Sequence, residues 1–259
     1  MVPTVSSAPP AETGVTYAEQ APPPVLAPWV RCVWRLTVQG EGGPDRVVPD
    51  GFMDLVASGP ELHLAGPDTG PWPVWRRPGA VAVGVRFHPG AAPGLVGPPA
   101  SELRDTRVAP GDLWGRPGRE LAGRVAEAAS PAARLRAMVA GVAARVDDAD
   151  PPDRLVAAAV AALELDPAAA RVGRLGPAVG LGERQLRRRF HAGVGYGPKT
   201  LARILRFQRL LALLRADPPG RPTLAEAAIR AGYADQAHMT SECTRLSGRS
   251  PTALLAGRR

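Results

Sequence analysis

Cysteine and histidine, two residues that often ligate metals, are scarce in this sequence. Two cysteines and four histidines occur among its 259 residues, and Cys32 and Cys243 lie far apart in the chain. One distant pair of cysteines makes neither a disulfide framework nor a zinc motif, so we expect a reduced, cytoplasmic setting. A metal site needs two or three histidines with a carboxylate, and no closely spaced pair of histidines exists. We therefore expect no bound metal.

The sequence also lacks the usual marks of catalysis and of membrane insertion. Neither cysteine makes a convincing nucleophile and no glycine-rich phosphate loop is present, so we expect no enzyme activity and no cofactor. No apolar run approaches the roughly 20 residues of a membrane span, and no secretory signal is evident, so no membrane partner is expected. Residues 1–20, rich in Pro, Ser, Thr and Ala, are predicted to form a flexible leader.

Lysine is almost absent, and the positive charge is unevenly distributed. Arginine supplies all but one of the 32 basic residues, the exception being Lys199, and the net charge is +8. Residues 1–150 carry 14 basic and 16 acidic side chains, a net charge of −2, whereas residues 151–259 carry 18 and 8, a net charge of +10. A basic segment joined to a nearly neutral one is typical of a polyanion-binding domain attached to a second domain.

The first of these two parts has the sequence pattern of a β-rich domain, which we place at residues 21–115. Strand-like runs occur at 30–38, 62–64 and 81–87, separated by segments with proline and glycine. All five tryptophans lie in this part of the chain. The simplest fold for it is a barrel or a sandwich with an aromatic core.

A helical segment is predicted for residues 116–150. Apolar residues recur at spacings of three and four, and Pro131 divides the segment into two amphipathic helices. The pair either forms a dimer contact or packs back on the β-rich domain. The polar run 147–152 ends in two prolines and marks the start of the last domain, residues 151–259. We therefore expect an α+β chain, with a β-rich N-terminal domain followed by an all-α double helix-turn-helix domain.

The last domain contains two half-copies of one helical pattern, 53 residues apart. The repeated positions are Phe190, Gly195 and Pro198 in the first copy and Cys243, Gly248 and Pro251 in the second. A glycine turn precedes each copy, at Gly180 and at Gly232. A helix, a glycine-containing turn and a second helix form a helix-turn-helix, whose second helix can lie in the major groove of DNA. Two in tandem predict a protein that reads two consecutive grooves.

The two candidate recognition helices carry different polar residues. In the first, at 183–191, Leu186 and Phe190 share the inner face. Capping residues predict that the second begins after Asp235 and that the helix before it begins after Thr223. Arginine can bind guanine edges or phosphates, and glutamine can read adenine. The predicted outward residues are Arg184, Arg187 and Arg188 in the first helix and Gln236, Ala237, Thr240 and Ser241 in the second.

This pattern resembles the DNA-binding domain of the AraC family of bacterial transcriptional regulators. The resemblance rests on the run 224–233, on Asp235 and on the run 248–251. It implies that the chain binds double-stranded DNA, with the two recognition helices in adjacent major grooves and the outward residues at the contact. RNA polymerase and a second copy of the chain are further partners compatible with the resemblance.

Several departures from the family pattern affect the second unit most. Cys243 replaces a bulky aromatic residue of the second recognition helix, which should loosen that unit by a few kcal/mol. Ser241 and Thr244 stand where cations are common. Gly176-Pro177 interrupts the helix before the first turn, where alanine is typical. The first recognition helix is therefore expected to supply most of the electrostatic attraction to DNA.

The β-rich domain resembles a sensor-like domain of a subset of AraC-type proteins. The resemblance rests on residues 48–55, 65–69, 84–92 and 103–105. It implies a cupin-like barrel that binds a small effector or mediates dimerisation. The candidate effector pocket consists of Trp34, Asp50, Asp54, Arg86 and His88. The structural alternative is that Asp50 closes a turn, that Arg86 pairs with a carboxylate, and that the tryptophans fill the barrel.

Three rival functions remain open at this point. A cupin-like domain raises the alternative of a metal-dependent enzyme, for which stoichiometric iron, manganese or zinc would be the sign. The helices could instead serve as a protein-interaction module, or as a nonspecific DNA-binding module with a degenerate second helix-turn-helix. The salt dependence of binding distinguishes DNA from a protein partner. For DNA, the logarithm of the binding constant falls with the logarithm of the salt concentration with a slope of about −0.9 per phosphate contacted, whereas binding through an apolar interface responds little to salt.

Overall fold

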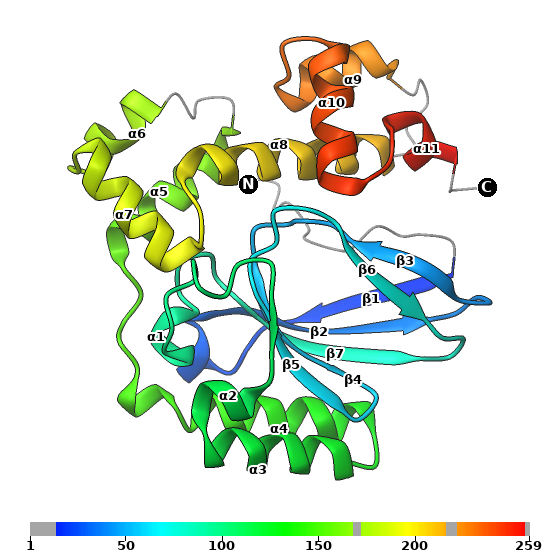
Figure 1. The fold of residues 1–259 in the computed structure, drawn as a ribbon, viewed down its shortest axis with the longest axis vertical. Helices are drawn as coiled ribbons and strands as arrows, with labels where there is room; N and C mark the ends of the chain where they lie inside the picture. The colour runs from blue at the N-terminus through cyan, green and yellow to red at the C-terminus, as the bar shows by residue number, and fades with distance from the viewer. Residues whose placement is uncertain (1–13, 168–171, 216–221, 257–259) are drawn as a thin grey trace.

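In the computed structural model, a β-rich domain flanked by helices precedes a series of helices that continues to the C-terminus (Figure 1). The structure describes residues 14–167, 172–215 and 222–256. The chain is α+β, with all its described strands between residues 15 and 108 and an all-helical region after them, as the sequence predicts.

Six strands form one antiparallel sheet, in the order β1-β2-β7-β4-β5-β8. Their bounds are β1 Val15–Gln20, β2 Val30–Val38, β4 Met53–Ser58, β5 Glu61–Ala65, β7 Val81–Phe87 and β8 Arg107–Val108. Two further strands, β3 (Gly43–Val47) and β6 (Trp72–Arg76), pair with each other as a separate two-stranded sheet. The three strand-like runs predicted from the sequence are confirmed as β2, β5 and β7.

The six-stranded sheet has two chemically different faces, because successive side chains of a strand point to opposite sides. In β4, Met53 and Leu55 enter a hydrophobic core, whereas Asp54 lines a cavity on the other face. In β7, Phe87 enters the same core and Arg86 lines the cavity. One face is therefore covered by helices, and the other, together with β3 and β6, encloses the cavity.

Helices α3 (Arg116–Glu127) and α4 (Pro131–Ala143) cover the core-side face. Ser130 caps α4 by accepting a hydrogen bond from the backbone N–H of Ala133. The core residues of these helices include Leu121, Val125, Met138 and Val142. Of the two roles weighed for this segment, packing on the β-rich domain is the one observed, and a dimer contact stays a prediction. Shorter helices complete the domain: η1 Pro24–Leu26, α1 Pro93–Val96, α2 Pro110–Trp114 and η2 Val146–Asp148.

The structure corrects part of the flexible leader predicted for residues 1–20. Residues 15–20 form β1, an edge strand that pairs antiparallel with β2 along its whole length. The strand is held by backbone hydrogen bonds to a partner distant in the chain, and the composition of such a short polar segment does not reveal them. The first 13 residues lie outside the described part of the chain.

Seven helices make up the described part of the C-terminal domain. Their bounds are α5 Arg154–Leu165, α6 Val172–Ala178, α7 Glu183–Val194, α8 Pro198–Arg215, α9 Leu224–Ala231, α10 Gln236–Ser247 and α11 Pro251–Ala256. Helices α6 and α7 form one helix-turn-helix, α9 and α10 form the second, and α8 runs between them (Figure 1). One hydrophobic core, which includes Phe190, Phe207 and Met239, joins both units to α8.

Local sequence features set the ends of these helices. Thr223 and Glu226 form the predicted capping box of α9, and Asp235 caps α10 through its side chain. The turn residues Gly180 and Gly232 have φ angles of 70° and 89°, in the left-handed region that favours glycine.

The Gly176-Pro177 departure has a local structural reason. A Cβ on Gly176 would come within 2.5 Å of the backbone oxygen of Leu181. The backbone N–H of Leu181 in turn donates to the backbone oxygen of Gly176 at 2.9 Å. The chain therefore turns back so tightly before α7 that a side chain at position 176 would be excluded.

On the cavity side, the ring of Trp34 lies against Gly84, its partner in the register of β2 and β7. A Cβ at Gly84 would come within 2.2 Å of an indole carbon. We expect Gly84→Ala to lower the free energy of unfolding by about 1–3 kcal/mol, because overpacking displaces the buried ring. Urea unfolding measures the change. Gly70→Ala, whose added Cβ meets nothing within 4 Å, is the control, and equal stability of the two variants would contradict the prediction.

Candidate nucleic-acid interface and ligand cavity

Helix α7 presents arginines on one side and apolar residues on the other. Its buried residues are Leu186, Phe190 and Val194. Arg184, Arg187 and Arg188 are exposed, and their spacings of three and four place them on one side of the helix. The structure therefore brings together the three residues predicted for this helix.

The fourth arginine of α7 has a structural role. Arg189 donates from Nη1 to Oδ2 of Asp153 at 2.5 Å, and Oδ1 of Asp153 accepts from the backbone N–H groups of Leu155 and Val156. Burial opposes ionisation of Asp153, but Arg189 and the two N–H donors outweigh it and lower the pKa of this carboxyl. Asp153 thus caps α5 and ties it to α7, which helps to position the exposed arginines.

Helix α10 presents a polar surface with less positive charge. Thr240 donates from Oγ1 to the backbone oxygen of Gln236 at 2.8 Å. The shallow depression on this surface is lined by Gln236, Ala237, Thr240, Ser241, Thr244 and Arg245. The first four are the predicted residues, and the structure brings them together. Arg245 was not predicted, although its position four residues after Ser241 would have indicated it.

A buried ion-pair network holds α10 against α8. Glu242 is 9% exposed and accepts from Nε of Arg203 at 2.7 Å, while its second oxygen lies 3.8 Å from Nη2 of Arg206. The guanidinium of Arg206 also lies over the ring of Tyr233, 5.5 Å from its centroid. These contacts connect the second recognition helix, the turn before it and α8, and the sequence pattern did not indicate them.

Cys243 fills a core position of α10. Its side chain is 0% exposed, and its thiol donates to the backbone oxygen of Arg249 at 3.6 Å. Burial raises the pKa of the thiol to about 11, so the residue is a neutral, packed side chain near neutral pH. The loosening expected from a small residue at this position stays a prediction.

A cavity of about 870 Å³ lies between the β3–β6 sheet and the face of the large sheet opposite α3 and α4. Four of the five residues predicted for an effector pocket line it: Trp34, Asp50, Asp54 and Arg86. Arg86 is 6% exposed and donates from Nε and Nη2 to the two oxygens of Asp54, each at 2.9 Å. Nη2 of Arg86 also lies 2.8 Å from Oδ2 of Asp50, and the indole N–H of Trp34 donates to Asp54 at 2.9 Å.

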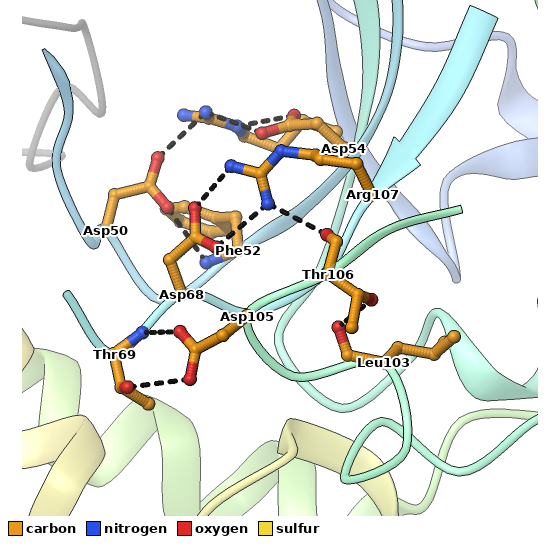
Figure 2. A network of polar contacts seen from close by, with 10 residues as sticks. Asp50, Phe52, Asp54, Asp68, Thr69, Leu103, Asp105, Thr106 and Arg107 are labelled. Atoms are coloured by element: carbon orange, nitrogen blue, oxygen red, sulfur yellow. Dashed lines mark hydrogen bonds and ion pairs between the residues drawn. The ribbon is translucent and has the colours of Figure 1, made fainter. Parts of the chain in front are cut away.

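A second arginine–carboxylate pair lies beside the first. Arg107 donates from Nη1 and Nη2 to the two oxygens of Asp68, at 2.9 and 2.7 Å, and its guanidinium lies 4.0 Å from the ring centroid of Trp72. Figure 2 shows Asp50, Asp54, Asp68 and Arg107 close together, and all four line the cavity. Arg107, Asp68 and Trp72 were not predicted, because they are distant in sequence from β4 and only the fold brings them to it.

The histidines of this domain lie in different places. His63, on β5, lines the cavity, and burial and the charge of Arg107 lower its pKa. His88 is not among the described residues that line the cavity, so its assignment to the pocket is corrected. Strand β7 ends at Phe87, and His88 lies just beyond it, with its backbone N–H donating to the backbone oxygen of Trp29 at 2.8 Å.

The polar end of the cavity carries more negative than positive charge. The carboxylates of Asp50, Asp54 and Asp68 face two guanidiniums, those of Arg86 and Arg107. Burial raises the pKa of Asp50, with Arg86 opposing the rise and Asp54 adding to it. Burial also raises the pKa of Asp68, against the effect of Arg107. Folding therefore disfavours the ionised forms of both groups.

The two domains contact each other next to this polar end. Gln208, on α8, lines the cavity and donates from Nε2 to the backbone oxygen of Pro49 at 2.6 Å. The backbone N–H of Ala100 donates to the backbone oxygen of Ala192, on α7, at 2.8 Å. Gly195, just after α7, packs so closely that an added Cβ would come within 2.9 Å of the Ala100 oxygen. Both α7 and α8 are thus in contact with the β-rich domain.

Two family models match the chain. Residues 175–257 match a family described as a helix-turn-helix domain. The C-terminal domain is an AraC-type helix-turn-helix domain. The chain is accordingly a DNA-binding transcriptional regulator. Residues 18–109 match a domain of unknown function, DUF6597, which lies in the β-rich part before the AraC-type domain.

Among curated proteins, no significant match to the sequence is found. Among solved structures, ToxT from Vibrio cholerae at 1.65 Å resolution is 10% identical, with a TM-score of 0.49 over 95% of this chain and 99% of that chain. An apo form of a lysine-to-alanine variant of ToxT, from strain SCE256, is also 10% identical, with a TM-score of 0.46 over 95% and 97%. With TM-scores below 0.5, these likenesses carry no argument about this chain.

Two features of other protein classes are missing from the described residues. No described helix combines the length and the apolar character that crossing a membrane requires. No group of three or more His, Cys, Asp or Glu in the described ranges is arranged so that it could hold a metal ion.

Cys32 is buried on the cavity side of β2, and burial raises the pKa of its thiol to about 12.

The raised pKa of Asp50 generates a prediction for stability. An acid whose pKa is raised by folding contributes stability below its unfolded pKa and loses it as the pH rises through the folded pKa. We therefore expect Asp50→Asn to unfold at a higher temperature than the wild type near neutral pH. The difference in unfolding temperature between Asp50→Asn and the wild type should disappear as the pH falls toward about 3.9, the usual Asp pKa. Thermal unfolding across pH measures it. Asp112→Asn, exposed on α2, is the control, and a destabilised Asp50→Asn would contradict the prediction.

The Glu242 network generates a second prediction. Glu242→Gln leaves Arg203 and Arg206 without the carboxylate they share, and breaking a buried ion pair from one side costs about 3–5 kcal/mol. We expect a loss of that size in the free energy of unfolding, measured with urea on the full chain. Glu120→Gln, which breaks an exposed pair with Arg116, should cost no more than about 1 kcal/mol. A small and equal effect in both variants would show that the network contributes little.

Proposed function

We propose that the chain regulates transcription by reading two adjacent major grooves with α7 and α10, and that the cavity of the β-rich domain controls this binding. The observation that carries the first part is the exposed side of α7, where Arg184, Arg187 and Arg188 lie together. Helix α8, which joins the two units, has 18 residues. At about 1.5 Å per residue it spans roughly 27 Å, comparable to one turn of DNA, about 34 Å.

The two recognition helices are suited to different contacts. The three exposed arginines of α7 can donate to guanine edges or to phosphates. In α10, Gln236 suits an adenine edge and Ala237 suits the methyl group of thymine. Thr240, Ser241 and Arg245 suit phosphate oxygens. The first helix would thus supply most of the charge and the second a share of the sequence preference.

The position of Gln208 supports control by the cavity. This side chain belongs to α8, lines the cavity and hydrogen-bonds to the backbone oxygen of Pro49. A small-molecule effector that fills the cavity would therefore meet the helix that joins the two DNA-binding units. We propose that effector binding changes the contact between α8 and the β-rich domain. RNA polymerase and a second copy of the chain are proposed as further partners.

Nonspecific DNA binding through α7 is the second candidate. It is favoured by the contrast in charge, because the depression on α10 has one cation, Arg245, whereas α7 exposes three. Binding of the full chain to a library of genomic DNA fragments at two salt concentrations tests both candidates. Enrichment of a site with two half-elements about one turn apart supports the proposed function. Salt-sensitive binding without enrichment supports the second candidate, and no binding at either salt favours a protein partner.

Arg188 provides the direct test of the α7 contact. We expect Arg188→Ala to weaken binding to an enriched site by about 1–3 kcal/mol if the guanidinium reads a base, or to reduce the salt slope by about 1 if it contacts a phosphate. Fluorescence anisotropy at several salt concentrations distinguishes the two. Arg124→Ala, which removes an exposed arginine of α3, is the matched control. Unchanged affinity and slope in Arg188→Ala would rule out the assigned contact.

A further inference from the structure

The cavity of the β-rich domain has an apolar end and a polar end. At the apolar end the rings of Tyr17 and Trp34 lie with their centroids 5.9 Å apart. Aliphatic side chains extend this surface: Leu36, Val38, Val56, Ala80 and Ala82. A ligand that occupies a cavity of about 870 Å³ would bury an apolar body against these side chains.

At the polar end, each guanidinium already has a carboxylate of its own. Arg86 binds both oxygens of Asp54, and Arg107 binds both oxygens of Asp68. Asp50 is a third carboxylate, and it shares Nη2 of Arg86 with Asp54. Among the described residues of this end, negative charges therefore exceed positive charges by one.

The arginines at the rim of the cavity do not restore the balance. Arg76 pairs with Asp45, which lies outside the cavity lining. Arg46 and Arg77 are exposed to solvent. Water and salt screen charges at such positions, whereas the charges of the buried end are screened much less. The rim can affect how a ligand approaches, but it contributes little to the field at Asp50.

An anionic ligand would have to compete for the two buried guanidiniums. Asp54 and Asp68 are each 9% exposed and hold their arginines through two-point contacts. A ligand carboxylate or phosphate would displace one of them and leave it buried without a partner, which is costly. A ligand cation would not have to displace Asp54 or Asp68 from its arginine. It would instead add a positive charge where carboxylates outnumber guanidiniums.

Aromatic rings already hold cations in this part of the domain. The guanidinium of Arg107 lies 4.0 Å from the ring centroid of Trp72, and that of Arg86 lies 4.8 Å from the ring centroid of Phe52. Ring faces attract cations most strongly where water is excluded. Asp50 offers a ligand cation a carboxylate in this same part of the cavity.

Resting on the effector role proposed above, we propose that the cavity binds an organic cation, an amine or quaternary ammonium group attached to an apolar body. The cationic group lies next to Asp50, and the apolar body packs against Tyr17 and Trp34. The raised pKa of Asp50 agrees with this assignment, because a cation beside the carboxylate would favour its ionised form.

Three probes with one body and different charge test the assignment on the full chain. Phenylbutylamine, phenylbutanol and phenylbutyrate are compared by isothermal titration calorimetry near neutral pH. We expect the amine to bind at least about tenfold more tightly than the alcohol, and the carboxylate to bind most weakly. Asp50→Asn should remove the preference for the amine over the alcohol, whereas Asp112→Asn, the same change on the exposed surface of α2, should retain it.

Equal or tighter binding of the alcohol or the carboxylate would overturn the proposal, and so would a preference for the amine that survives Asp50→Asn. Absence of binding by all three probes would also overturn it. The same preparations are assayed for DNA binding without probe. Failure of the cation test with intact, Arg188-dependent DNA binding rejects only the ligand class. Loss of that DNA binding would reject the function proposed above, whatever the probes show.

Discussion

Burial of the Arg86 guanidinium is the constraint on which the β-rich domain depends. A charge that is 6% exposed must be neutralised, and Asp54 of β4 does this through two hydrogen bonds, while Asp50, in the loop before β4, adds a second carboxylate beside it. The same loop carries Pro49, whose backbone oxygen accepts from Gln208 of α8. A short path of contacts and adjacent residues therefore leads from the middle of the sheet to the helix between the two DNA-binding units.

The helical domain depends on a second buried charge in a comparable way. Glu242 of α10 is held by Arg203 and Arg206 of α8, so the orientation of the second recognition helix is tied to α8. The first recognition helix is tied to α5 through Arg189 and Asp153. Helix α8 thus contacts the cavity through one side chain and the second DNA-binding unit through others. This double contact makes α8 the element that joins the cavity to the second helix-turn-helix unit.

Sequence patterns predicted the helical domain better than the β-rich domain. Helix ends at Thr223 and Asp235 and turns at Gly180 depend on atoms only a few residues apart, so local rules sufficed. Strand β1 was not predicted from the sequence, because the strand with which it pairs is distant in the chain. His88 is two residues after Arg86, but β7 ends at Phe87, so the strand pattern does not carry His88 to the cavity side.

The sequence by itself determined the two helix-turn-helix units, the arginine side of α7 and the presence of strands around the tryptophans, because periodicity, caps and turns act over short distances. Only the tertiary structure decided which polar groups of the β-rich domain meet. Asp68, Trp72 and Arg107 join Asp54 through the register and layering of two sheets, and Gln208 joins them from another domain. Such contacts depend on partners far apart in the chain, and residue spacing alone does not encode them.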